Sequence, residues 1–337
     1  MLSATERELT LDYLANLQRP NGMVPWFDGG HSDIWNHCEA VIAFFLGGRI
    51  EHGLAGLDWV RERQHRDGSF AHYYFDCGVQ EPRRELNCSI YPAVAVLVAT
   101  RSLDRSWILD RYWPMLERSL EYVLRYQDDE GRFPWAVEPG GRVMSRYLKT
   151  GNSSMLTSLD AAIALRRGPT AFRAKVLRAR DSLAEVLVRS EFGESWLMDD
   201  KSDWAMDWYY PVLAGSIDPE LTREKTRYLL RRHFEPGHGI RCLGSSRWVT
   251  TAETAEFAMA LSLGGSCDAA RSLLALVETR RSVDGGYLTG LSLPSGNSFP
   301  SDEYSSYSAA AVILADHVIS TGVRGSLIDA LVGGYDG

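Results

Sequence analysis

The sequence predicts an all-α protein with the architecture of an (α/α)6 toroid, in which six helical hairpins supply six inner and six outer helices. Three observations predict it. A short turn that ends in glycine recurs six times, an amphipathic helix precedes each turn, and an apolar helix rich in small residues follows it. Six hairpins without an intervening linker favour a single domain over residues 1–337 rather than two stacked helical domains.

The recurring turns mark where each outer helix ends. After a helix, glycine adopts the left-handed backbone conformation without a Cβ clash, which makes it the usual residue at such a turn. An aromatic residue follows most of these glycines, as Phe70 does in the second turn. The six turn glycines are Gly22, Gly68, Gly131, Gly193, Gly237 and Gly285.

An outer helix is expected before each turn. Ser3 and Glu6 form a capping box that begins the first helix, which runs roughly to Gln18. Arginine and glutamate on one side of each helix indicate a face in water. The other outer helices are expected near residues 54–64, 105–127, 169–190, 219–234 and 267–281.

The inner helices are apolar nearly all round, which predicts burial on most sides. Because inner and outer helices alternate, every inner helix starts at the same end of the barrel, and six positive helix N-termini converge on one mouth. The segments that enter these helices are rich in acidic and aromatic residues with scattered amides. The inner helices are expected within residues 35–48, 87–100, 152–165, 207–215, 251–265 and 304–319.

Composition narrows the range of partners. The net charge is −8 and no basic block occurs, which disfavours nucleic acid and anionic membranes as partners. The charged N-terminal segment lacks the apolar run of a signal peptide, and no stretch is long and apolar enough to span a membrane. Five cysteines show no metal-type pairing. We therefore expect a cytoplasmic protein with neither metal nor cofactor; its oligomeric state stays open.

Two of the turns, QHRDGSF and QDDEGRFPW, resemble the repeat motif of terpene cyclases and protein prenyltransferases. That resemblance implies a helical toroid. The DxDD acid of the cyclases is absent, and no cysteine stands in the zinc-binding context of the transferases. Asp199 to Asp203 fits the DDxxD motif of another terpene synthase fold, but no second metal motif follows. An isoprenoid cyclase or transferase remains an alternative, with Arg146 and Lys149 as the nearest approach to a diphosphate site.

The segment GNSSMLTSLDAAIAL resembles the inner-helix entries of six-hairpin glycosidases. More narrowly, the chain resembles the mycobacterial methylmannose polysaccharide hydrolases. These resemblances imply a glycoside hydrolase that acts on an intracellular oligo- or polysaccharide, and the narrower one implies an endo-α-mannosidase. A toroid that binds glycans without catalysis is a further alternative.

Glycoside hydrolysis requires two carboxyl groups beside the scissile bond, one to protonate the leaving oxygen and one to activate water or attack the sugar. The protonated group needs a raised pKa, which a loop beside tryptophan favours and a helix start opposes. We therefore expect Asp33, flanked by His31 and Trp35, to be the acid. Glu253 is the expected base and Glu256 its close rival, followed by Asp207 and Glu85.

The remaining candidates are expected to bind substrate. Aromatic side chains would stack on sugar rings, and amide or guanidinium groups would bind hydroxyls. His31, Asp33 and His37 are expected to form hydrogen bonds rather than a metal site. The predicted substrate-binding residues are Trp26, Trp35, Asn36, His37, Glu85, Asn87, Arg146, Tyr147, Asn152, Trp204, Asp207, Trp208, Tyr209, Arg247, Trp248, Asp302 and Tyr304.

Overall fold

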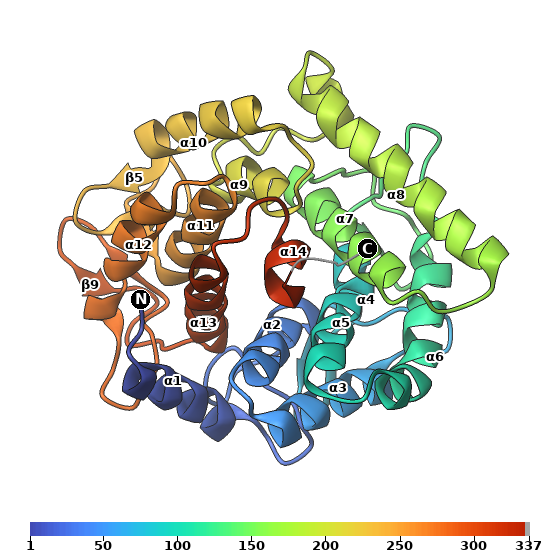
Figure 1. Cartoon of the computed structure of the whole chain (residues 1–337), viewed down its shortest axis with the longest axis horizontal. Helices are drawn as coiled ribbons and strands as arrows, with labels where there is room; N and C mark the ends of the chain where they lie inside the picture. Colours follow the sequence, from blue (N-terminus) through green and yellow to red (C-terminus); the bar gives the residue numbers. More distant parts are fainter. Residues whose placement is uncertain (334–337) are drawn as a thin grey trace. The chain divides into compact units, whose positions relative to one another are not determined.

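A computed structural model describes residues 1–333 of the chain, which divides into two compact units (Figure 1). The first unit contains residues 1–18, 26–29 and the chain from residue 201 onward. The second unit contains residues 19–25 and 30–200. Each unit has its own set of inner and outer helices.

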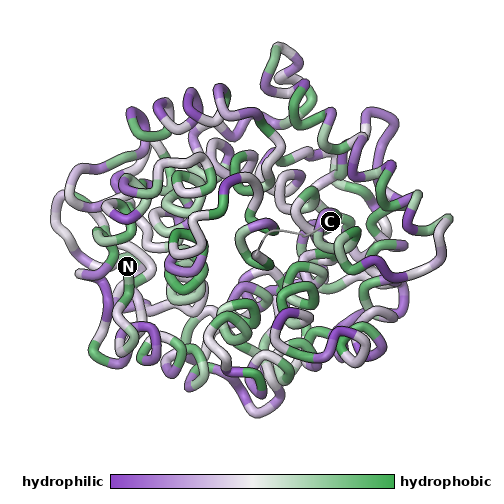
Figure 2. Tube along the Cα trace, viewed as in Figure 1, coloured by the Kyte–Doolittle hydropathy of each residue, from purple (hydrophilic) through white to green (hydrophobic). Residues whose placement is uncertain are grey.

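The second unit consists mainly of three hairpins. The inner helices α2, α5 and α7 pack in that order, and α3, α6 and α8 each cover the inner helix that precedes them. The inner helices bury nearly every side chain, in agreement with their apolar sequences (Figure 2). The helices are α2 (Ile34–Leu46), α3 (Ile50–Arg63), α4 (Leu86–Ile90), α5 (Pro92–Ser102), α6 (Arg105–Val123), α7 (Lys149–Ala164) and α8 (Thr170–Glu191).

One predicted inner helix is divided in the structure. Residues 87–100 were expected to be continuous, but α4 ends at Ile90 and α5 starts at Pro92. Proline has no N–H for the helical ladder and its ring crowds the preceding turn, which accounts for the break. Tyr91 forms the junction, and its side chain lies among the buried residues.

Two short strand pairs shape the entrances to α2 and α4. Strand β1 (Tyr73–Phe75) pairs with β2 (Gly78–Glu81), and Tyr74 also forms a bridge with Ser32, next to the start of α2. Strand β3 (Arg84–Glu85) pairs with β4 (Ala136–Val137) and leads directly into α4. These pairs hold two sequence-predicted acids, Asp33 and Glu85, at helix starts.

The first unit also contains three inner helices. Helix α11 packs between α9 and α13, while α10, α12 and α1 lie against α9, α11 and α13, respectively. The short helix α14 packs on α13 and α11. The helices are α1 (Ala4–Leu17), α9 (Met206–Leu213), α10 (Pro219–His233), α11 (Thr251–Leu263), α12 (Cys267–Ala275), α13 (Ser306–Thr321) and α14 (Leu327–Val332), and a 3-10 turn covers Glu278–Arg280. A second 3-10 turn, Ser195–Leu197, belongs to the second unit.

A five-stranded antiparallel sheet precedes α11 and α13 in the first unit, in the order β5-β6-β7-β8-β9. The sequence did not indicate it, because strands this short show no periodicity. Strand β7 ends at Thr250, directly before α11, so the sheet fixes the start of that helix. The strands are β5 (Phe234–Glu235), β6 (Gly239–Arg241), β7 (Trp248–Thr250), β8 (Gly290–Ser292) and β9 (Asn297–Ser298).

The structure also explains why the turns repeat. Gly68 has a φ of 96°, and a Cβ there would lie 2.1 Å from the carbonyl oxygen of Arg118 on α6. Gly285 meets Leu9 on α1 in the same way. In the second turn, Gln64 donates from Nε2 both to Gly68 and to Met115 on α6. The turns at Gly22, Gly68, Gly131 and Gly285 therefore dock on the next outer helix and require glycine for both conformation and close approach. Gly193 and Gly237 have positive φ angles but no atom within 4 Å of a Cβ position.

No helix among residues 1–333 is long and apolar enough to cross a membrane.

Candidate functional site: two carboxyl clusters

The second unit contains a group of buried acids and aromatic rings, which we call the Asp33 cluster. Its members come from the start of α2, the β1 and β3 strands and the α4–α5 junction. They combine carboxyl groups with imidazole, indole and phenol rings. The cluster consists of Asp33, Trp35, Asn36, Glu39, His72, Tyr73, Glu85, Cys88 and Tyr91.

Asp33 is a buried carboxyl group at the start of α2. It is the N-cap of that helix, and its Oδ1 accepts a hydrogen bond from the backbone N–H of Asn36 at 2.9 Å. Its Oδ2 accepts a second from Asn36 Nδ2 at 2.6 Å. Because Asp33 is buried, these two bonds replace much of its hydration.

Glu85 is the carboxyl group of this cluster whose pKa is raised. Burial raises its pKa to about 7, and the negative charge of Asp33 acts in the same direction. The His72 Nδ1 atom lies 3.2 Å from Glu85 Oε1, and the Cys88 thiol donates to Oε2 at 3.5 Å. Burial also lowers the pKa of His72, so the imidazole is mainly neutral near pH 7. Glu85 is therefore a carboxyl group that retains a proton close to neutral pH.

Aromatic rings line the rest of the cluster. The indole N–H of Trp35 donates to Glu39 Oε1 at 3.0 Å, and the Tyr91 hydroxyl donates to the same oxygen at 3.4 Å. The Trp35 and Tyr91 ring centroids are 5.6 Å apart. Tyr73 lies against His72, with their centroids 3.7 Å apart. Glu39 thus holds two rings in position, and the cluster combines flat faces with acids.

The first unit contains the second group, which we call the α11 cluster. Glu253 and Glu256 lie near the start of α11, and the Thr250 hydroxyl donates to Glu253. Glu256 accepts hydrogen bonds from Tyr209 and, at 3.0 Å, from Tyr210, both on α9. The cluster consists of Glu253, Glu256, Asp207, Tyr209, Tyr210, Cys242, Thr250 and Tyr307.

Glu256 is the protonated member of this cluster. Burial raises its pKa well above the ordinary value for glutamate, and the charge of Glu253 raises it further. The same charge contributes to the raised pKa of the Cys242 thiol, after burial. Trp26 packs edge-on against Tyr307 of α13, with centroids 5.1 Å apart. This cluster therefore also contains a carboxyl group with a raised pKa beside a second carboxyl group.

Several predicted residues thus lie together within their own unit. Asp33, Trp35, Asn36 and Glu85 belong to the second unit, and Trp26, Asp207, Tyr209, Glu253 and Glu256 to the first. Asp33 and Glu253 belong to different units, so their predicted pairing as acid and base stays a prediction. Asn87 is buried on α4, between the cluster members Glu85 and Cys88.

Two predicted sugar-binding residues, His37 and Asn152, already form hydrogen bonds with backbone groups. His37 Nδ1 accepts from the Val24 N–H at 3.1 Å, and its Nε2 lies 3.0 Å from the Gly56 carbonyl oxygen. The Asn152 side chain bonds both the N–H and the carbonyl of Phe133. Both residues are almost completely buried. Their polar atoms hold loops against inner helices, and we leave both residues out of the proposed site.

The other predicted aromatic residues of the first unit lie at its edge. Trp208 stacks on Tyr228 of α10 with centroids 3.9 Å apart, and its indole donates to the Ser202 carbonyl. The Trp248 indole donates to the Phe299 carbonyl at 2.8 Å. These contacts are packing contacts of the loops, while Trp204 remains 40% exposed. Arg247 and Asp302 are exposed, and Tyr304 is half-buried.

In the second unit, Arg146 is exposed and Tyr147 lies under the guanidinium of Arg132, which is 3.9 Å from the ring centroid. The Tyr147 N–H donates to Asp199 at 3.1 Å. Asp203 of the DDxxD-like segment bonds Arg232 and Ser245. No group of three or more potential metal ligands gathers anywhere in residues 1–333. The acids of that segment therefore serve as loop anchors.

The sequence analysis did not select Glu39, His72, Tyr91 or Tyr210, which the structure adds to the clusters. Tyr91 and Tyr210 lie in segments whose sequence predicts a buried helix, where a tyrosine side chain usually makes only packing contacts. A tyrosine hydroxyl buried in an apolar helix needs a partner, and that requirement was the available signal. No sequence pattern indicated the approach of His72 to Glu85.

Comparison with solved structures shows the fold. A glycosidase, solved as a glutamate-to-alanine variant, matches with a TM-score of 0.75 and 12% identity over 95% of this chain and 99% of its own. A Clostridium perfringens α-amylase matches at 0.68, with 9% identity, over 92% and 96% of the two chains. A D-mannose isomerase matches at 0.67, with 12% identity, over 95% and 98%. The predicted (α/α)6 toroid is thus confirmed. Because an isomerase shares it, the fold alone does not identify the reaction.

Comparison of sequences identifies the family, although no family model matches. The MMP endo-(1,4)-3-O-methyl-α-D-mannosidase of Mycolicibacterium hassiacum is 31% identical over 330 residues, which cover 97% of this chain and 89% of that protein. This relationship supersedes both the isoprenoid and the non-catalytic alternatives. The chain belongs to the family of this mannosidase and is a glycoside hydrolase.

Proposed function

We propose that the protein cleaves internal α-(1,4) bonds in a polysaccharide of 3-O-methylated mannose. The observation that carries this proposal is the similarity to the M. hassiacum mannosidase along nearly the whole chain. A large insertion, or a deletion that removed a hairpin, would have interrupted the aligned region. The buried acids and flat rings of the two clusters are the groups that such a reaction needs.

We further propose that Glu85 donates the proton to the leaving oxygen. Its pKa of about 7 keeps a useful fraction protonated at neutral pH, as a general acid requires. Asp33, which the sequence predicted to be this acid, takes the other role in this proposal. As the N-cap of α2 it accepts two hydrogen bonds from Asn36. Its carboxylate would activate water or attack the anomeric carbon.

The rings of the Asp33 cluster would bind the sugar. Trp35, Tyr73 and Tyr91 offer flat apolar faces, which suit the C–H faces of a pyranose ring. A 3-O-methyl group adds apolar surface and removes one hydrogen-bond donor from each sugar. Aromatic walls would therefore favour the methylated polymer over an unmodified one.

The α11 cluster provides a second candidate pair. Glu256, whose pKa is raised, would be the acid of this pair, and Glu253 would be its partner. Two tyrosine hydroxyls already occupy Glu256, however, and would have to be displaced before it could protonate a sugar oxygen. For that reason we rank this pair below Glu85 and Asp33.

The substrate proposal is tested by incubating the enzyme with α-(1,4)-linked 3-O-methylmannose oligomers, unmethylated α-(1,4)-mannan oligomers and malto-oligosaccharides. Mass spectrometry of early products should show internal cleavage of the methylated oligomers first. Release of single terminal sugars alone would contradict the endo assignment. Faster cleavage of malto-oligosaccharides would contradict the substrate class.

The catalytic proposal is tested with the single variants Asp33→Asn, Glu85→Gln, Glu253→Gln and Glu256→Gln. Our assignment requires the largest losses of kcat in the first two. Losses confined to the glutamates of α11 would transfer the chemistry to that pair. Inactive Asp33→Asn and Glu253→Gln together with an active Glu85→Gln would restore the pairing that the sequence predicted.

A further inference from the structure

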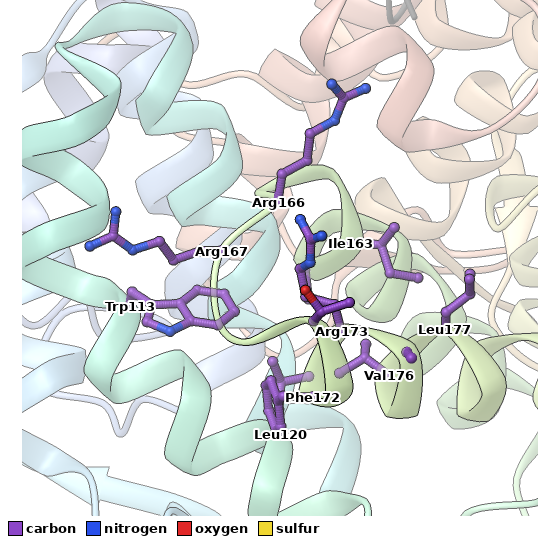
Figure 3. A pocket seen from close by; sticks show the side chains of 12 residues that line it. Trp113, Leu120, Ile163, Arg166, Arg167, Phe172, Arg173, Val176 and Leu177 are labelled. Atoms are coloured by element: carbon purple, nitrogen blue, oxygen red, sulfur yellow. The ribbon is translucent and has the colours of Figure 1, made fainter.

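A groove lies on the outer surface of the second unit, between α6, the α7–α8 loop and the first turns of α8 (Figure 3). Its volume is about 390 Å³, which is within the range of small-ligand pockets. None of its lining residues belongs to the two carboxyl clusters. The groove is lined by Trp113, Leu120, Ala162, Ile163, Arg166, Arg167, Thr170, Phe172, Arg173, Ala174, Val176 and Leu177.

The body of the groove is apolar. Trp113 and Phe172 meet edge to face with centroids 6.4 Å apart. Leu177 remains 47% exposed although it lies on this surface. Apart from the Trp113 indole, Thr170 is the only neutral polar side chain in the lining. A sugar or a nucleobase would therefore lose hydrogen bonds to water here without gaining partners.

The rim of the groove is cationic. Figure 3 shows Arg166 and Arg173 extending toward the top of the view, whereas Arg167 extends to the left. Arg167 forms an ion pair with Asp110 at 2.8 Å. Among residues 1–333, neither Arg166 nor Arg173 makes a side-chain hydrogen bond or ion pair. Both guanidinium groups are exposed beside the groove.

Local backbone structure adds to this positive charge. Pro169 is the N-cap of α8 and offers no side-chain cap, so the first N–H groups of this 22-residue helix lack that partner. Arg166 holds a φ of 52°, a left-handed conformation that residues other than glycine rarely adopt. Arg166 is therefore both a residue with a strained backbone and one of the two arginines at the rim of the apolar groove.

We propose that this groove binds an alkyl carboxylate, with the chain on the apolar lining and the carboxylate at Arg166 and Arg173. Guanidinium groups bind carboxylates through paired N–H donors, and they do so most strongly when no protein acid competes. The small volume excludes a folded partner. An inorganic anion would leave the apolar surface uncovered. The ligand must therefore carry both features in one small molecule.

Isothermal titration calorimetry of the whole chain with decanoate tests the proposal. We expect saturable binding of one molecule, with an affinity that falls as salt is raised because the rim is exposed. Acetate, which lacks the chain, and decyltrimethylammonium, which reverses the charge, should not bind at this site. Equal binding of decanoate and decyltrimethylammonium would overturn the proposal, as would the absence of decanoate binding.

Variants locate the site. Arg166→Ala and Arg173→Ala should each weaken decanoate binding roughly 5- to 20-fold, and Arg173→Lys should lose less. Ala174→Trp, which places an indole inside the groove, should abolish binding. Arg178→Ala is the matched control, because Arg178 is exposed on the same helix outside the groove. An equal loss in Arg178→Ala would show non-specific attraction and contradict the assigned site.

None of these variants touches the proposed catalytic groups, so hydrolysis by the unliganded enzyme should be unchanged in all of them. The two proposals can therefore fail independently. A protein that binds decanoate in the groove but does not cleave methylmannose oligomers would contradict only the proposed function.

Discussion

The two carboxyl clusters share an electrostatic arrangement but differ in how their protonated acid is held. In each, burial and a neighbouring carboxylate raise the pKa of one glutamate, Glu85 in the second unit and Glu256 in the first. Glu256 is fixed by two tyrosine hydroxyls from α9. Glu85 is accompanied by a thiol, a neutral imidazole and a hydrogen bond from the Trp135 side chain, and no tyrosine hydroxyl holds it.

This difference suggests that one carboxyl group has a structural role and the other a catalytic role. A carboxyl that is saturated by strong donors is well placed to fix structure, because moving its proton would disturb the whole network. A carboxyl with weak partners can exchange its proton with a substrate at little cost. Raised pKa values alone therefore do not identify the catalytic acid, and the partners of each group decide between them.

The largest expected effect is the loss of hydrolysis in Glu85→Gln. Removal of a general acid typically costs about 10²- to 10⁴-fold in rate. The loss should be much smaller with a 2,4-dinitrophenyl glycoside, because that leaving group departs without a proton. Asp33→Asn should lose activity on both kinds of substrate. If the dinitrophenyl substrate does not rescue Glu85→Gln, Glu85 is not the proton donor.

The fold was largely predictable from the sequence. Which of the acidic residues has a raised pKa was not. The glycine turns and apolar helices indicate the hairpins because both signals are local, and Gly68 and Gly285 have the predicted conformation. The raised pKa of Glu85 depends on burial and on Asp33, which belongs to another hairpin. Asp33 itself could have been recognised as an N-cap, since aspartate directly before a helix commonly takes that role.

The structure also shows where sequence patterns mislead. His37 and Asn152 stand at helix starts like the other predicted ligands, yet their polar atoms bond backbone groups of neighbouring loops. Sequence position shows that a polar residue lies near a helix entrance but not which way it faces. The five-stranded sheet was missed because each of its strands is too short to show a periodic pattern.

The second prediction concerns the α11 cluster. Glu256→Gln should lower the melting temperature, because the amide offers one acceptor oxygen where the carboxyl group offers two, and a buried tyrosine hydroxyl loses its partner. Such a loss costs about 1–3 kcal/mol. Under our assignment kcat should fall by only about tenfold, through displacement of Glu253. A loss of kcat as large as that of Glu85→Gln would remove the contrast between the two clusters.

The third prediction is the pH profile of kcat/KM, which reports groups of the free enzyme. Because Glu85 must be protonated, activity should decline as pH rises through about 7. With the dinitrophenyl substrate the decline near pH 7 should disappear. Its persistence there would assign the decline to another group.

The fourth prediction concerns stability and is specific to Glu85. Its pKa is 4.5 when unperturbed and about 7 in the folded protein, so the folded state binds more protons between these values. Stability should therefore decrease as pH rises from about 4.5 to 7 and be fully reduced above that range. Glu85→Gln should remove this penalty and stabilise the fold at pH 8 by up to about 3 kcal/mol.

Urea unfolding of wild type and Glu85→Gln at pH 4, 6 and 8 measures this effect. The gain should be absent at pH 4 and largest at pH 8, while Glu62→Gln, on the exposed face of α3, should show no such trend. A pH-independent difference would mean that Glu85 is ionised throughout and cannot be the acid.

The smallest expected effect is that of Tyr210→Phe, which removes one of the two hydroxyls that hold Glu256. The hydroxyl stabilises the ionised form, so its loss should raise the pKa of Glu256 further and leave the protonated state intact at neutral pH. With the Tyr209 bond retained, kcat should change less than threefold, in keeping with a typical hydrogen bond worth about 1 kcal/mol or less. The kcat at pH 6 and 8 checks this. A large, pH-dependent loss would show that proton transfer passes through Glu256, and the supporting cluster would then be the catalytic one.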